Sequence, residues 1–298
     1  MLMGNLAARL SRVPVVITTF HGLSGIHGGG ETLGDAHILQ RLYPKIEGML
    51  GRWCTDACVG WSERVRTDSI RARGLQPERV AVIHNGISHD ESHPVGDSIR
   101  RTDMRRRMGL EPDDFVVGTV GRLVAVKGQR HLVAAMPHIA RELPRARLLI
   151  VGAGPMRNEL ENAASRWGVR ERVLFAGDLR ADSGVHSCFD VFVYPSVDGV
   201  FGLVVQEAMA CGVPVVVSGL EGTDELVKHK ENGLLVPPGD ERAIAEAVLL
   251  ISRNPDLRQR LIDSGRATIA REFTDAGMAR QYRSLYESLL GDRVNANR

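Results

Sequence analysis

The chain has 298 residues, of which 43% are hydrophobic and 25% are charged, a composition typical of a globular protein with room for two domains. Its 38 basic and 36 acidic residues give a formal net charge of +2, which argues against a nucleic-acid partner because backbone binding needs a strong basic field. No apolar run approaches the roughly 18–20 residues of a membrane-spanning helix. We therefore expect a cytoplasmic protein, with peripheral contact at the inner face of the membrane as an open alternative.

Residues 1–98 read as part of an α/β domain. The segments VPVVITTFHG, ACVGWS and RVAVIHNG predict three strands, and residues 36–51 predict a helix. Three strands are few for an independent domain, so we expect a truncated first domain. Residues 88–114 form the link to the second domain. We interpret their arginines (Arg100, Arg101, Arg105, Arg106 and Arg107) as a solvated helix face, with an anionic-membrane patch as the alternative.

Residues 99–272 predict a complete second domain. Six short apolar runs read as buried strands, and helical patterns separate most of them. The runs are FVVGTVGRL, ARLLIVG, RVLFAG, DVFVYPS, VPVVVSG and NGLLVPP, and the helices are 128–143, 155–167, 202–211 and 240–253. Such alternation predicts a doubly wound parallel sheet, whose ligands bind outside the carboxyl ends of the strands.

The chain ends in a helical region. Beyond Pro255 the pattern is helical to about Leu290. We assign residues 273–298 to a C-terminal helix and tail, and we expect that helix to pack back on the first domain.

The segment GRLVAVKG (121–128) places two cations after a strand and before a helix. Arg122 offers a planar fork to phosphate oxygens, and Lys127 offers a point charge. The pair can bracket a diphosphate, although such pairs are more often solvated surface charge.

The segment PSVDGVFGLVVQEAMACGVPVVVS (195–218) predicts a strand, a glycine-containing loop and a helix that begins near Gly202. Backbone amides at Phe201, Gly202 and Leu203 lack helical partners there and favour an anion. Glu207, within the helix, can accept both hydroxyls of a ribose. Standing alone, it reads more readily as a solvated helix residue.

Five motifs in order carry a family resemblance. GRLVAVKG, LLIVGAGP, RVLFAG, DVFVYPS with FGLVVQEAMACGVPVVVS, and NGLLVPPGD resemble the donor domain of glycosyltransferase family 4, which has the GT-B fold of two Rossmann-like domains. Weaker agreement extends upstream through TFHGL and VIHNGI. The resemblance implies that residues 1–98 form the acceptor side and residues 99–272 bind a nucleotide-sugar donor.

The resemblance also assigns roles to individual residues. Arg122 and Lys127 would hold the donor diphosphate, and Glu207 would bind the ribose. His21 matches a histidine that faces the donor sugar, and the amides of Phe201, Gly202 and Leu203 would face the sugar or phosphate. Members of the family retain anomeric configuration and need no metal or other cofactor, because the cations replace the metal. The acceptor would be a saccharide or a lipid-linked hydroxyl.

Two departures from the family pattern bear on this interpretation. A glutamate usually stands seven residues before the position of Glu207 and contacts the donor sugar, but here that position is Gly199, with Asp198 as a neighbouring substitute. The front of the first domain is also absent, which indicates a fragment or a chain that works with a partner. Two alternatives therefore stay open: a non-catalytic nucleotide-sugar binding module, and an epimerase or hydrolase on the same fold.

Overall fold

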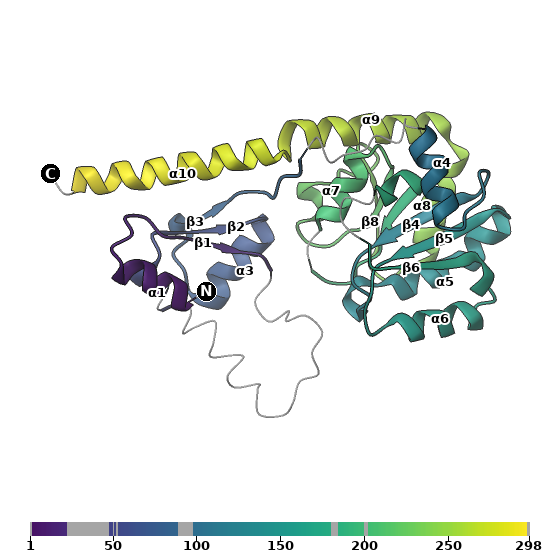
Figure 1. Ribbon diagram of the computed structural model, residues 1–298, viewed down its shortest axis with the longest axis horizontal. Helices are drawn as coiled ribbons and strands as arrows, with labels where there is room; N and C mark the ends of the chain where they lie inside the picture. The colour runs from purple at the N-terminus through teal and green to yellow at the C-terminus, as the bar shows by residue number, and fades with distance from the viewer. Residues whose placement is uncertain are drawn as a thin grey trace, which may run out of the picture. The chain divides into compact units, whose positions relative to one another are not determined.

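The computed structural model describes residues 2–22, 48–49, 51, 53–88, 98–179, 184–199 and 202–296. Backbone contacts divide the chain into two units: residues 1–86 with 275–298, and residues 87–274 (Figure 1). The second unit is thus continuous in sequence, whereas the first is built from both ends of the chain.

The first unit contains a three-stranded parallel sheet in the order β1-β2-β3. Its strands are β1 (Ile17–Phe20), β2 (Ala57–Gly60) and β3 (Val80–Val82), each inside a predicted segment. The N-terminal part also contains the helices α1 (Leu2–Leu10) and α3 (Glu63–Arg73) and the 3-10 turn η1 (Pro77–Arg79), and residues 48–49, 51 and 53–54 are helical. Ser62 begins α3 by accepting a hydrogen bond from the amide of Val65, and Gly74 ends it in a left-handed conformation.

The C-terminal helix α10 (Asp275–Ala296) belongs to the first unit. The hydroxyls of Tyr282 on α10 and Thr19 on β1 lie 3.0 Å apart. This hydrogen bond joins residues 263 positions apart.

The second unit contains a six-stranded sheet in the order β6-β5-β4-β7-β8-β9, and all its pairings are parallel. The strands are β4 (Phe115–Val120), β5 (Ala146–Val151), β6 (Val173–Gly177), β7 (Val191–Tyr194), β8 (Val215–Ser218) and β9 (Leu234–Val236). Counted from β4, this is the doubly wound order 3-2-1-4-5-6 of dinucleotide-binding sheets. The predicted α/β class with parallel sheets is therefore confirmed.

Helices cover both faces of this sheet (Figure 1). Its helices are α4 (Ser98–Arg107), α5 (Gln129–Glu142), α6 (Arg157–Arg166), α7 (Leu203–Ala210), α8 (Glu241–Arg253) and α9 (Pro255–Glu272). Helix α5 packs against α6 and α8, and α7 packs against α9. Leu132, Met136 and Ile139 form the buried stripe of α5 and join the core with strand residues such as Leu148 and Val193. Short 3-10 turns lie in the loops: η2 (Ala125–Lys127), η3 (Arg170–Arg172), η5 (Val185–Cys188) and η6 (Thr223–Glu225).

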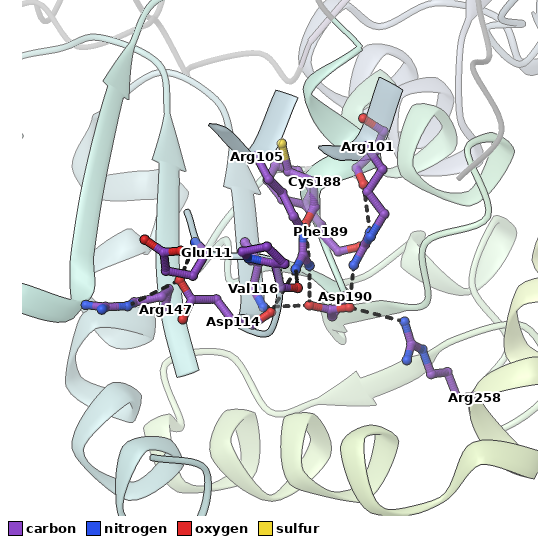
Figure 2. A network of polar contacts seen from close by, with 12 residues as sticks. Arg101, Arg105, Glu111, Asp114, Val116, Arg147, Cys188, Phe189, Asp190 and Arg258 are labelled. Atoms are coloured by element: carbon purple, nitrogen blue, oxygen red, sulfur yellow. Dashed lines mark hydrogen bonds and ion pairs between the residues drawn. The ribbon is translucent and has the colours of Figure 1, made fainter. Parts of the chain in front are cut away.

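One carboxylate organises the amino-terminal edge of this sheet (Figure 2). Asp190 precedes β7, and its Oδ2 accepts hydrogen bonds from the amide of Val116 on β4 and from Arg105, both at 2.7 Å. Its Oδ1 accepts from Arg101 at 2.7 Å, and the Arg258 guanidinium of α9 lies 3.4 Å away. The carboxylate thus connects two central strands and two helices.

Two of the arginines expected on a solvated helix face point inward instead. The side chain of Arg105 is 5% exposed, and it also donates to the carbonyls of Pro112, Asp114 and Cys188. Arg101 donates to the carbonyls of Ser187 and Phe189. That prediction is wrong for these two residues because their guanidiniums have buried acceptors, although Arg106 and Arg107 are exposed as expected.

We predict that Asp190→Ala destabilises the second unit by roughly 3–5 kcal/mol, because the substitution leaves buried guanidiniums without their counter-charge. The measurement is the free energy of unfolding in urea, followed by circular dichroism. Asp103→Ala is the matched control, since it breaks an exposed ion pair with Arg107 on the same helix α4 and should cost less than about 1 kcal/mol. Equal losses in the two variants would contradict the structural role of Asp190.

Candidate functional site

The strand order places the site where the direction of winding reverses. β4 and β7 are neighbours in the sheet. The strand that follows β4 in the chain, β5, lies on one side of this pair, and the strand that follows β7, β8, lies on the other. Loops that leave the carboxyl ends of two such strands diverge and leave room for a ligand between them. The two segments singled out in the sequence follow these two strands.

The loop after β4 carries both predicted cations. It forms the 3-10 turn η2 and leads into α5. The buried side chain of Gln129 donates to the carbonyl of Arg122 at 3.0 Å and so closes this loop on itself. Lys127 is partly buried and Arg122 is exposed.

Backbone contacts join the loop after β4 to the loop after β7. The carbonyl of Val126 accepts hydrogen bonds from the Ser196 hydroxyl at 2.9 Å and from the Val197 amide at 3.0 Å. Gly128 adopts a φ of +65°, and a Cβ at this position would lie 2.0 Å from the carbonyl oxygen of Pro195. Only glycine permits this approach, which holds Lys127 beside the end of β7.

The ammonium of Lys127 is directed toward the start of α7. Its Nζ donates to the Tyr194 hydroxyl at 2.7 Å and lies 5.0 Å from the centre of that ring. The same hydroxyl lies 3.6 Å from a Cβ built on Gly202, the residue that precedes α7. Tyr194 is itself buried and therefore provides a fixed acceptor for the Lys127 ammonium.

Helix α7 offers backbone donors at this point. Its N-cap residue, Gly202, has no side chain that could cap the first turn and adopts an extended conformation. The first amides of a helix have no intrahelical acceptor, and the helix dipole adds partial positive charge. Leu203, the first residue of α7, is exposed. Phe201, the other predicted amide donor, lies outside the described residues.

The remaining predicted cation faces solvent. The guanidinium of Arg122 makes no hydrogen bond or ion pair with the part of the chain that the structure describes. It therefore keeps all its donors for a ligand, whereas Lys127 shares its ammonium with Tyr194.

Glu207 lies one turn further along α7, with its side chain 31% exposed. Its Oε2 is 3.9 Å from Nε2 of His186, which lies in the turn η5 before β7. Burial lowers the pKa of His186 to about 4, so its imidazole is neutral at physiological pH. The sequence interpretation missed this residue, and the available signal was weak: a histidine among the apolar residues Val185, Cys188 and Phe189 before β7.

Asp198 and Gly199 form a tight turn in the loop after β7. Asp198 is exposed, and its Oδ1 accepts a hydrogen bond from the amide of Gly199 at 2.6 Å. Gly199 has a φ of +104°, a conformation that disfavours any residue with a Cβ. The local backbone therefore suits glycine and would be strained with a glutamate.

His21 belongs to the first unit, where it directly follows β1 and is exposed.

No group of three or more metal-binding side chains occurs within the described ranges. Among the described helices, none is both long and apolar enough to cross a bilayer. The four cysteines are buried and free, and burial raises the pKa of Cys188 to about 12, which keeps its thiol protonated.

Comparison with protein families gives two matches. The profile described as Glycosyl transferases group 1 matches residues 100–268, and the profile described as Glycosyltransferase Family 4 matches residues 1–91. Between them the two profiles cover most of both structural units and leave out residues 92–99 and 269–298.

Two curated relatives are similar in sequence. An uncharacterized glycosyltransferase of Methanocaldococcus jannaschii, MJ1607, is 34% identical over 70% of this chain and 54% of its own length. A D-inositol 3-phosphate glycosyltransferase of Xylanimonas cellulosilytica is 32% identical over 93% of this chain and 67% of its own length. The chain thus spans between about half and two thirds of the length of these relatives.

Among solved structures, Alr3699/HepE of Anabaena in complex with UDP superimposes with a TM-score of 0.83. It is 24% identical, and the match covers 96% of this chain and 76% of that one. The same protein has also been solved with UDP-glucose. The likeness confirms the GT-B-like α/β fold.

The lowered pKa of His186 predicts an acid-sensitive fold. Between pH 6.5 and about 4 the unfolded state binds a proton at this imidazole and the folded state does not, so stability is full above pH 6.5 and declines as the pH falls. At pH 5 the loss from this residue is about 2 kcal/mol relative to pH 7. The charged side chains near this turn are Glu207, with Oε2 3.9 Å from Nε2, and Arg101 and Arg105, which donate to the carbonyls of Ser187 and Cys188.

The measurement is the urea unfolding free energy of the wild type and of His186→Phe at pH 7 and pH 5. The decrease on acidification should be smaller in the variant by about 2 kcal/mol. The same decrease in both proteins would show that His186 binds its proton equally well in the folded and unfolded states.

Proposed function

The chain belongs to the family of glycosyl transferases group 1, and from that premise we propose that it transfers a sugar from a nucleoside-diphosphate sugar to a hydroxyl acceptor with retention of anomeric configuration. The position of Lys127 carries this proposal. A cation held by Tyr194 beside the first turn of α7 is suited to a diphosphate, because charge and amide donors act on the same anion.

The chemistry follows from where negative charge develops. Cleavage of the anomeric bond releases a nucleoside diphosphate that carries additional negative charge. Lys127 and the amides at the start of α7 are in place before that step, so they stabilise the leaving group without reorganisation. Arg122, which is exposed in the same loop, supplies the second cation.

Other residues are proposed to contact the ribose and the sugar of the nucleotide-sugar donor. Glu207 lies one turn beyond the phosphate-binding amides and accepts the ribose hydroxyls in this proposal. Asp198 and Gly199, in the loop before α7, lie on the side of the donor sugar. For His21, the family resemblance implies a contact with the donor sugar.

Arg122 and Lys127 take the place of a metal ion in this proposal, because two cations and the start of a helix neutralise the diphosphate. The proposed acceptor is a saccharide or a lipid-linked hydroxyl, and the proposed location is the cytoplasm, with peripheral contact at the membrane for a lipid-linked acceptor. The name of the Xylanimonas relative, with a phosphorylated inositol acceptor, supports a small hydroxyl compound as one class of acceptor.

Gly199 favours a second candidate, a nucleotide-sugar binding module without turnover. The family usually has a glutamate at this position that contacts the donor sugar, whereas the positive φ here suits glycine. Such a module would bind the diphosphate through the same residues and would not consume the donor.

We predict that Lys127→Ala weakens binding of a nucleoside diphosphate by roughly 10- to 100-fold, the loss expected for a hydrogen bond to a charged group. The affinity for the corresponding nucleoside should barely change, because it lacks the phosphates. Calorimetric titrations with UDP, GDP and ADP, and with their nucleosides, measure both quantities.

Lys228→Ala is the matched control, because it removes the same charge from an exposed position between β8 and β9. Equal losses of affinity for the nucleoside and the nucleoside diphosphate, or equal losses in the two variants, would contradict the role of Lys127.

An activity assay distinguishes the candidate functions. If UDP-glucose, GDP-mannose or ADP-glucose releases its nucleoside diphosphate only when a saccharide acceptor is present, the result supports a transferase. Release without acceptor supports a hydrolase, and binding without release supports the second candidate.

A further inference from the structure

His186 has a buried polar atom that the fold does not satisfy. Its side chain is 8% exposed, and its Nε2 has no hydrogen-bond partner in the part of the chain that the structure describes. Buried polar groups are nearly always hydrogen-bonded, so an exception within a candidate site calls for a functional explanation.

The imidazole is fixed by two aromatic neighbours. Its centre lies 5.7 Å from the ring of Phe189 in an edge-to-face contact and 5.8 Å from the ring of Phe192. Both phenylalanines are almost fully buried. Packing thus holds the imidazole in place, and Oε2 of Glu207 lies 3.9 Å from its Nε2.

The distance from Nε2 to Oε2 is longer than a hydrogen bond, and Glu207 is the more exposed member of the pair. Its side chain is 31% exposed on the surface of α7, whereas His186 is enclosed. A hydrogen bond between them requires the Glu207 carboxylate to approach Nε2 when the nucleotide binds. The carboxylate can only accept, so the contact requires the hydrogen to be on Nε2.

The cations near the turn η5 are engaged with backbone carbonyls, so they do not compete with His186 as hydrogen-bond donors to Glu207. Arg101 and Arg105 of α4 approach the same turn, but they donate to its carbonyls at Ser187, Phe189 and Cys188. Burial lowers the pKa of His186, so the ring is uncharged and can present a single N–H to the carboxylate.

We propose that His186 is a positioning residue for Glu207, donating from Nε2 to one carboxylate oxygen so that the other is oriented toward the ribose hydroxyls of the bound nucleotide. The proposal rests on the proposed nucleotide-binding function and deepens it. In this proposal Glu207 and His186 together determine the preference for ribose over 2′,3′-dideoxyribose, and only Glu207 contacts the ligand.

The test compares the affinities of UDP and 2′,3′-dideoxy-UDP for the wild type and for His186→Phe. The phenylalanine ring keeps the packing against Phe189 and Phe192 and removes the donor. We expect UDP to bind about 5- to 10-fold more weakly to this variant, as for one lost hydrogen bond, and the dideoxy ligand to bind unchanged. His186→Gln retains an N–H donor of similar reach and should restore most of the UDP affinity.

A purely structural role of His186 would give a different pattern. His186→Phe would then weaken both ligands equally, or His186→Gln would fail to restore binding, and either result would overturn the proposal. His186→Leu is a second apolar variant with the same expected affinities, so the test does not depend on whether a phenylalanine fits.

The variant Glu207→Ala distinguishes the ribose-binding role of Glu207 from the positioning role of His186. If this variant loses the preference for UDP over the dideoxy ligand and His186→Phe keeps it, the ribose site stands and the role of His186 is wrong. If the wild type shows no such preference, the ribose role of Glu207 is itself wrong, and the role of His186 with it.

Discussion

The second unit depends on the carboxylate of Asp190 at the amino-terminal edge of its sheet. It binds the amide of Val116 on β4, two guanidiniums of α4 and, more distantly, Arg258 of α9. β4 and β7 run parallel, so fixing them together at one end also sets the position at which they finish. The loops that carry Lys127 and α7 begin at those other ends.

The opposite edge is organised by backbone rather than by charge. The hydrogen bonds of Val126 to Ser196 and Val197, and the close approach allowed by Gly128, hold the two loops together before any ligand is present. This arrangement leaves the Lys127 ammonium beside Tyr194 and the start of α7. Charge therefore stabilises the fold at one edge of the sheet and is available for a ligand at the other.

Much of the second unit could be predicted from sequence because its signals are local. Runs such as VFVY and the apolar stripe of α5 report burial directly, and parallel strands then place Arg122, Lys127 and α7 at one edge. The partners of Arg101 and Arg105 could not be predicted, because Asp190 lies more than 80 residues away. The proximity of His186 to Glu207 was missed because only the folded chain brings η5 to α7.

A crystal structure of this chain with a bound nucleoside diphosphate is the most direct test of the proposed site. We predict that the phosphates lie between Nζ of Lys127 and the first amides of α7, with the ribose next to Glu207. A diphosphate bound away from the carboxyl ends of β4 and β7, with no contact to Lys127 or α7, would contradict the proposed site.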